Sequence, residues 1–315
     1  MTDDPDFAHA VPAARVLRRA RGRWRLVAFV ALAVAVLALA GRFALPGSGN
    51  SDHVARIVID GVIATDPGRL DAIEAMIEDD AVKAVIVAIN SPGGTTAGGE
   101  ELYDALSRLR EVKPVVATIA ELGASAAYMT AISANRIFTR RLSIVGSIGV
   151  YYSHVDAGKL LDTIGVDFDK VQTGPLKAEP DLDDPMTGAV RQSLQRLVDD
   201  SYEWFVDIVA ERRGIERDTV LELADGRILT GRQAVAAALA DAFGGEREAI
   251  VWLEQQWNIG EGLPVFTHYP PAEDGLAQLL RYAGGQALSL VGLGGGSTNA
   301  LDGLVSLWQA ENLVD

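Results

Sequence analysis

Ser125 is the first residue in the sequence that could attack a carbonyl carbon. It stands in a run of small residues, Gly-Ala-Ser-Ala-Ala at 123–127, between a predicted strand and a predicted helix. A nucleophilic serine needs a tight turn that presents its hydroxyl and a following backbone N–H that binds the developing negative charge. The alternative is a helix N-cap, which is the more common use of a serine taken alone.

A Pro-Gly-Gly sequence at 92–94 could stabilise an oxyanion. Gly93 and Gly94 end a predicted buried strand and precede a predicted helix. With no Cβ in the way, glycine backbones can turn their N–H groups toward a ligand. Such a pair at the start of a helix can bind a developing negative charge. An ordinary strand-to-helix turn is the alternative, and for an isolated Pro-Gly-Gly it is favoured.

The base that would activate a serine must be a histidine or a lysine. The four histidines are poorly placed, and only His154 is near the predicted core; they are His9, His53, His154 and His268. Lys177 lies in a loop, Thr-Gly-Pro-Leu-Lys-Ala at 173–178, between a predicted strand at 168–171 and a predicted helix at 188–213. A lysine acts as a base only where burial favours its neutral form. A solvated loop lysine is the alternative.

Composition excludes several classes of protein. The 315 residues contain no cysteine, which excludes disulfide-rich domains, cysteine nucleophiles and cysteine zinc sites. An apolar content of 49% argues against wholesale disorder. The net charge of −15 argues against a nucleic-acid partner, because such proteins need basic surfaces.

The N-terminus predicts a membrane anchor. Residues 1–25 carry six arginines and three aspartates, a charge of +3 that leaves −18 for the rest. Residues 26–45 are almost entirely apolar and would span about 30 Å as a helix, one hydrocarbon core. The positive-inside rule puts the arginines in the cytoplasm and the body outside it. A cleaved signal peptide, with Ala-Leu-Ala at 38–40 as the site, and a buried core helix are the alternatives.

Strands and helices alternate in the remaining chain. After a polar linker at 46–54, apolar strands are predicted at 55–60, 84–89 and 115–119, and helices at 68–79, 100–109 and 188–213. This alternation is typical of βαβ units and an α/β fold. We expect one domain over 55–260 and a C-terminal extension over 261–315, with a short helix at 299–313.

Six segments together resemble a known family. They occur in its order: Ile-Val-Ile-Asp-Gly at 57–61, Ser-Pro-Gly-Gly at 91–94, the run around Ser125, Gly-Ser-Ile-Gly-Val at 146–150, Gly-Pro-Leu-Lys at 174–177 and Thr-Gly-Arg-Gln-Ala at 230–234. This order is similar to that of the signal peptide peptidase family of membrane-anchored Ser/Lys proteases, in its short, single-domain bacterial form.

The resemblance implies roles for individual residues. It makes Ser125 the nucleophile, Lys177 the general base, and Ser147 the residue that orients the lysine amine. The oxyanion hole would be formed by the N–H of Ala126 with that of Gly93 or Gly94. Where the family usually has Gly-Gly after the serine, this chain has alanines at 126 and 127. Alanine is tolerated there only if φ is negative.

The resemblance also implies a fold and an assembly. The fold would be the α/β fold of crotonases and the Clp protease, with no metal or organic cofactor. Half-length members form rings in which neighbouring subunits supply the serine and the lysine of one dyad. We therefore expect a single-pass protease of the bacterial inner membrane that cleaves remnant signal peptides and other apolar peptides on the periplasmic or extracellular side. The alternatives are a crotonase-type acyl-CoA enzyme and an inactive ring-forming scaffold.

Overall fold

The computed structural model describes residues 28–33, 51–271 and 304–307. The chain separates into two compact units, Met1–Ser51 and Asp52–Asp315. In the first unit, residues 28–33 are helical, and the remainder of the predicted span at 26–45 lies outside the described residues. In the described part of the chain, no helix is both long and apolar enough to cross a membrane. The anchor therefore stays a prediction.

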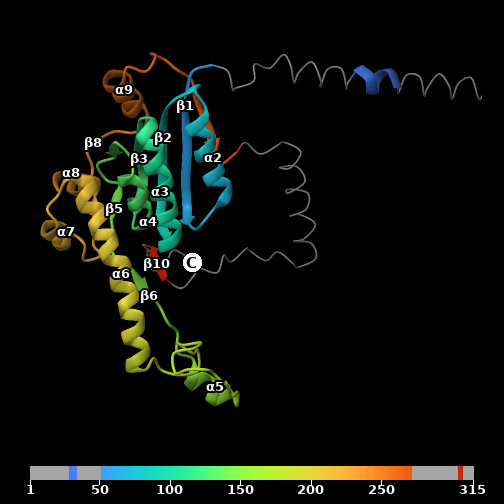
Figure 1. The fold of residues 1–315 in the computed structure, drawn as a ribbon, viewed down its shortest axis with the longest axis vertical. Helices are drawn as coiled ribbons and strands as arrows, with labels where there is room; N and C mark the ends of the chain where they lie inside the picture. Colours follow the sequence, from blue (N-terminus) through green and yellow to red (C-terminus); the bar gives the residue numbers. More distant parts are fainter. Residues whose placement is uncertain (1–27, 34–50, 272–303, 308–315) are drawn as a thin grey trace, which may run out of the picture. The chain divides into compact units, whose positions relative to one another are not determined.

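Four parallel strands form the centre of the second unit (Figure 1). They are β1 (His53–Ile63), β2 (Val82–Thr95), β3 (Val115–Ala124) and β4 (Arg136–Thr139). Two further strands extend this sheet in the same direction, β9 (Val265–Tyr269) beside β1 and β8 (Ala242–Phe243) beside β4. The helices between consecutive parallel strands give βαβ units, which confirms the predicted α/β class.

Four more strands surround the carboxyl ends of β2 and β3. They are β5 (Ile144–Gly146), β6 (Tyr151–Tyr152), β7 (Ile228–Thr230) and β10 (Leu304–Leu307). Strand β5 is parallel to the end of β3 and antiparallel to β7. Strand β10 is antiparallel to both β2 and β6 and lies between them. The sheet thus includes residues from the predicted C-terminal extension, and the helix predicted at 299–313 is wrong at 304–307.

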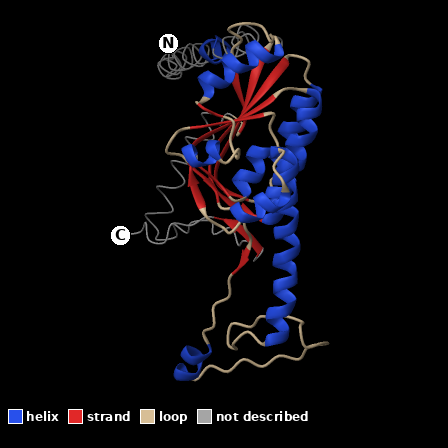
Figure 2. Ribbon diagram, turned by 90° about the vertical axis from the view of Figure 1, so that its left-hand side faces the viewer, coloured by secondary structure: helices blue, strands red, loops and turns tan. Residues whose placement is uncertain are grey.

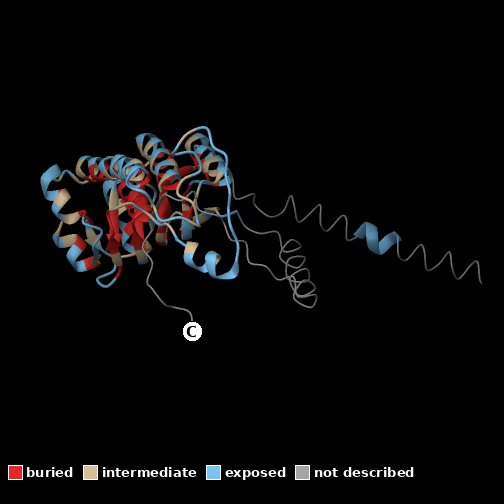
Figure 3. Ribbon diagram, turned by 90° about the horizontal axis from the view of Figure 1, so that it is seen from below, coloured by how far each residue is buried: buried red, intermediate tan, exposed pale blue. Residues whose placement is uncertain are grey.

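Helices cover both faces of the sheet (Figure 2). The larger buried cluster joins one face to α2 (Pro67–Glu78), α3 (Thr96–Val112), α4 (Ala126–Ile132) and the second half of α6 (Gly188–Arg213). The smaller cluster joins the other face to α9 (Glu246–Trp257). Buried residues are accordingly concentrated in the sheet and the helix surfaces that face it (Figure 3). Two short helices, α7 (Arg217–Leu223) and α8 (Gly231–Ala236), complete this layer.

A long excursion leaves the sheet between β6 and α6. Residues 153–187, which we call the arm, include α5 (Gly158–Ile164) and extend away from the sheet beside the first half of α6 (Figure 1). The strand predicted at 168–171 is wrong, because these residues have no sheet edge to join and remain irregular. Exposed apolar side chains are frequent here: Val155, Leu160, Ile164, Val166, Phe168, Val171, Leu176 and Leu182. Clustered apolar exposure of this kind is typical of an interaction surface.

Candidate active site

Ser125 occupies a strained turn between β3 and α4. Its backbone has φ 60° and ψ −123°, a conformation that costs a non-glycine residue about 1–3 kcal/mol. Its N–H donates to the Gly146 carbonyl (2.8 Å), and its carbonyl accepts from Tyr128 and Met129 (2.8 and 3.1 Å). Ser125 occupies the N-cap position of α4, but within the described residues its hydroxyl makes no capping hydrogen bond to that helix. Strain of this kind clusters at functional sites.

Helix α4 is fixed firmly behind Ser125. The Tyr128 hydroxyl donates to the carbonyl of Leu239 (2.8 Å), and this side chain is fully buried. Burial raises the pKa of Tyr128, so the phenol stays protonated and keeps donating. The sequence does not predict this hydrogen bond, because the two residues that form it are 111 residues apart.

The alanines after Ser125 fit the turn. Ala126 and Ala127 begin α4 and are not among the residues with positive φ. Their methyl groups therefore cause no backbone strain. A Cβ placed on Gly99 of α3 would lie 3.0 Å from the Ala126 Cβ, so the glycine makes room for this methyl. Because the first N–H groups of a helix have no partner within it, the Ala126 N–H is available by geometry for an oxyanion.

Gly93 and Gly94 lie at the same edge of the sheet as Ser125. Ser91 is the register partner of Gly123, so Gly93 and Ser125 each follow this pair by two residues. Gly93 has φ 103° and donates its N–H to the Ser91 hydroxyl (3.1 Å). A Cβ on Gly94 would lie 1.7 Å from the Ile63 carbonyl oxygen. Both glycines are therefore required by the turn itself, whatever their role in binding.

Ser147 is also at this edge. Gly146 is the register partner of Ala124, so Ser147 and Ser125 follow paired residues on adjacent strands. Ser147 has φ 52°, is 9% exposed, and donates its N–H to the Arg227 carbonyl (2.8 Å). The structure thus gathers five of the six predicted site residues at the carboxyl ends of β2, β3 and β5.

Lys177, the sixth, is elsewhere in the chain. It is exposed in the arm, where its N–H donates to the Gly174 carbonyl (3.0 Å). The arm extends away from the sheet that carries Ser125 and Ser147 (Figure 2). Nearby, Lys170 forms ion pairs with Glu179 and Asp181. A single chain in this conformation therefore does not bring the predicted base to the predicted nucleophile.

The chain's own strand β10 lies beside this edge of the sheet. Strand β10 pairs with residues 93–95 of β2 on one side and with β6 on the other. These residues of β2 include both predicted oxyanion glycines. The chain's own strand thus lies antiparallel to the segment next to Ser125, in the way that peptide strands add to a sheet edge. No local pattern in the sequence predicts this pairing, since it joins segments about 200 residues apart.

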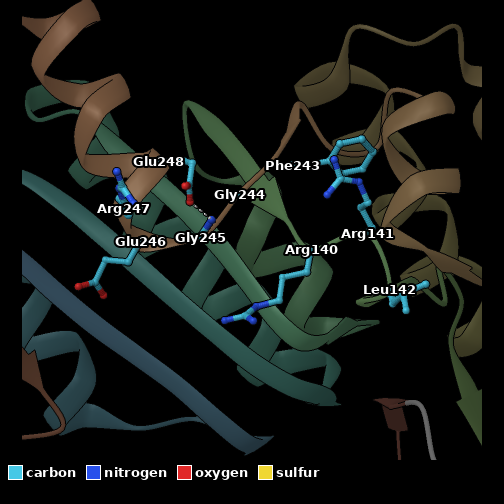
Figure 4. Close-up of a pocket in the computed structure, with 9 residues that line it drawn as sticks. All are labelled: Arg140, Arg141, Leu142, Phe243, Gly244, Gly245, Glu246, Arg247 and Glu248. Carbon is cyan, nitrogen blue, oxygen red and sulfur yellow. Dashed lines mark hydrogen bonds between the residues drawn. The ribbon is translucent and has the colours of Figure 1, made fainter.

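A separate cavity of about 800 Å³ contains none of the predicted site residues (Figure 4). It is lined by Arg140, Arg141 and Arg247, together with residues at the start of α9. Its acidic groups are already engaged: Glu246 pairs with Arg56 (2.8 Å), and Glu248 accepts from the Gly245 N–H (2.8 Å). It is not part of the arrangement around Ser125.

Known proteins match this chain over the region just described. The profile of Peptidase family S49 matches residues 107–260, a range that holds Ser125, Ser147 and Lys177. A putative protease of Synechocystis is 36% identical over 201 residues, covering 63% of this chain and 72% of the relative. One from Methanocaldococcus jannaschii is 34% identical over 216 residues, covering 68% and 69%. A putative signal peptide peptidase of Enterococcus faecium is 28% identical over 227 residues, covering 67% and 66%.

Among solved structures, a ClpP1 mutant from Listeria monocytogenes superposes with a TM-score of 0.42. Its sequence is 14% identical, and the alignment covers 61% of this chain and 92% of that one. This score is below the level that establishes a common fold.

Proposed function

The chain belongs to peptidase family S49 and is a serine peptidase, and we propose that Ser125 is its nucleophile. The observation that carries this assignment is the strained turn at Ser125, directly before Ala126 at the first position of α4. The Ser125 hydroxyl attacks the peptide carbonyl and forms an ester as the C–N bond breaks. The leaving amine takes the proton that the base removed from the serine, and water then hydrolyses the ester.

Backbone N–H groups stabilise the charge that develops on the substrate oxygen. The Ala126 N–H supplies one hydrogen bond, and that of Gly93 or Gly94 supplies a second. Removing a single donor of this kind typically lowers kcat by about 100- to 1000-fold. In the structure the Gly93 N–H is donated to Ser91, so a small rotation of this turn would be needed for Gly93 to serve.

The base comes from a neighbouring subunit. Lys177 projects from an arm rich in exposed apolar side chains, while the five other site residues lie in the body. A head-to-tail contact that rests the arm of one subunit on the next would bury the Lys177 amine beside Ser125 and Ser147. Repetition of this contact closes a homo-oligomeric ring. Burial there would favour the neutral amine that a base requires.

The substrate is an extended peptide. A peptide lying antiparallel to residues 93–95 of β2 would present its carbonyl to Ser125, at the position that β10 takes in the structure. The apolar segment at 26–45 would anchor the enzyme in the bacterial inner membrane with the body on the periplasmic or extracellular side. Remnant signal peptides and other apolar peptides are the substrates that this location supplies.

Labelling with a fluorophosphonate probe tests the assignment of Ser125. We expect covalent labelling of the wild-type protein and none of Ser125→Ala, since the probe reacts only with an activated serine. Ser153→Ala, which changes an exposed serine of the arm, is the control and should label normally. Persistent labelling of Ser125→Ala would show that another residue is the nucleophile. An acyl-CoA enzyme or an inactive scaffold would leave the wild type unlabelled.

Removing β10 should free this edge of β2 for a peptide. We expect a chain ending at residue 271 to react with the same probe about tenfold faster, because the competing strand is absent. Val305→Pro is the matched full-length variant, since proline removes the N–H that a strand donates. Unchanged labelling rates in both variants, with thermal stability retained, would show that β10 does not compete with ligands.

A further inference from the structure

A small cavity opens one helical turn from Ser125. Its volume is about 310 Å³, and it is lined by Thr96, Ala97, Glu100, Met129, Asp200, Ser201 and Trp204. The Met129 N–H donates to the Ser125 carbonyl (3.1 Å), which ties this side of the cavity to the nucleophile's turn. Thr96 and Ala97 directly follow the residues of β2 that pair with β10. The cavity therefore adjoins the path of an extended peptide bound beside Ser125.

Two large apolar side chains, those of Met129 and Trp204, form part of the cavity wall. Met129 is buried, and Trp204 is half-buried. The Tyr103 ring meets the Trp204 ring edge-on, with centroids 5.8 Å apart and an interplanar angle of 87°. This contact holds the indole in place as a preformed surface. A long methylene chain could lie against such walls.

The rim of the cavity is acidic and carries no internal counter-charge. Glu100 and Asp200 are exposed, and in the described part of the chain no lysine or arginine forms an ion pair with either of them. Other acidic residues of the same two helices do form ion pairs: Glu101 of α3 lies 3.5 Å from Arg69, and Asp207 of α6 lies 2.6 Å from Arg217. Two carboxylates are thus left lining an open cavity whose wall also holds the Trp204 ring.

We propose that this cavity, here called the acidic subsite, binds a lysine or arginine side chain of the peptide substrate. The inference rests on the proposed function and adds a preference to it. The aliphatic stem packs on the half-buried Trp204 ring, and the cationic head donates to Glu100 and Asp200. The face of Trp204 adds a cation–π contact. A glutamate in the same position would be repelled by both carboxylates.

Binding to an inactive enzyme tests this preference separately from catalysis. We would measure the Kd of fluorescent decapeptides for full-length Ser125→Ala by anisotropy, with arginine, norleucine or glutamate placed at each position in turn. We expect one position where arginine binds about tenfold tighter than norleucine and glutamate binds more weakly than either. The advantage should shrink as salt rises, because both carboxylates are exposed.

Charge-neutralised variants identify the groups responsible. Adding Glu100→Gln and Asp200→Asn to Ser125→Ala should bring the ratio of the arginine and norleucine Kd values close to one. The matched control, Asp199→Asn with Glu203→Gln, removes the same charge from exposed positions of α6 outside the cavity and should keep the ratio. Because the readout is a ratio, partial misfolding does not mimic the result. Equal Kd values for all peptides, or a ratio that survives the first pair, would overturn the proposal.

The same peptides separate this inference from the proposed function. Probe labelling that fails in the wild type, together with a retained arginine preference in binding, would overturn the assignment of Ser125 as the nucleophile and leave the acidic subsite standing. Labelling that depends on Ser125, with no arginine preference at any position, would overturn the acidic subsite alone.

Discussion

Lys177→Arg is expected to lower kcat/KM for a peptide substrate by at least about a thousandfold, close to the effect of removing the nucleophile. Arginine keeps the positive charge and much of the length of the side chain, so the arm can still dock. It cannot give up its proton near neutral pH, however, and so cannot take one from Ser125. The measurement is steady-state hydrolysis of a fluorogenic peptide, with fluorophosphonate labelling as a second readout.

Lys170→Arg is the matched control for this prediction. Lys170 lies in the same arm and is paired with Glu179 and Asp181, so it is held as a cation. An arginine can make the same ion pairs, and hydrolysis should change less than about threefold. Substantial turnover by Lys177→Arg would remove this lysine from the mechanism. A loss of equal size in Lys170→Arg would assign both effects to the structure of the arm.

The central sheet could be predicted because its signals are local. Val85, Val87 and Ile89 face one cluster while Ala84 and Ile86 face the other, so the strand is apolar throughout. Parallel strands buried on both faces produce this pattern in any short stretch of sequence. The long helix at 188–213 was equally clear, since its caps are local too: the Thr187 hydroxyl accepts from the Val190 N–H, and Gly214 ends the helix with φ 62°.

The active-site turn could be predicted only in part. A run of small residues pointed to Ser125, but its positive φ depends on a hydrogen bond to Gly146, a residue of another strand. The fit of Ala126 likewise depends on Gly99, which lies on a different helix. Such features are set by tertiary packing, and no short stretch of sequence encodes them.

The wrong predictions share one cause. Residues 168–171 have the composition of a strand but no partner strand within reach, and residues 304–307 pair with the exposed edge of β2. In both segments the presence or absence of a neighbouring strand decides whether a strand forms, because a strand needs a partner for its backbone hydrogen bonds. Under the proposed function, the arm with its many exposed apolar side chains would likewise find its partner in a second subunit.

Mixed rings should recover activity from two inactive variants. Ser125→Ala keeps Lys177, and Lys177→Ala keeps Ser125, so a site whose two residues come from adjacent subunits is intact when the right pair meets. With equal amounts and random order around a ring, about one quarter of the sites are complete. We would co-express the variants with different tags, purify rings that carry both tags, and measure hydrolysis and probe labelling.

This experiment distinguishes a dyad within one chain from a dyad formed between neighbouring chains. A single variant is inactive in both arrangements and cannot tell them apart. If Ser125 and Lys177 of one chain formed the dyad, after a movement of the arm, both variants would stay inactive in any mixture. If the lysine comes from the neighbour, the mixture recovers activity, and the probe labels only the Lys177→Ala subunits, which alone retain the serine. Rings that combine Lys177→Ala with a Ser125→Ala/Lys177→Ala double variant are the control and should remain inactive, since no subunit then supplies the amine. Recovery in the first mixture and not in the second would assign the base to the arm of the neighbouring subunit. In the first mixture no single chain carries both residues, so only a lysine from one subunit can activate the serine of another.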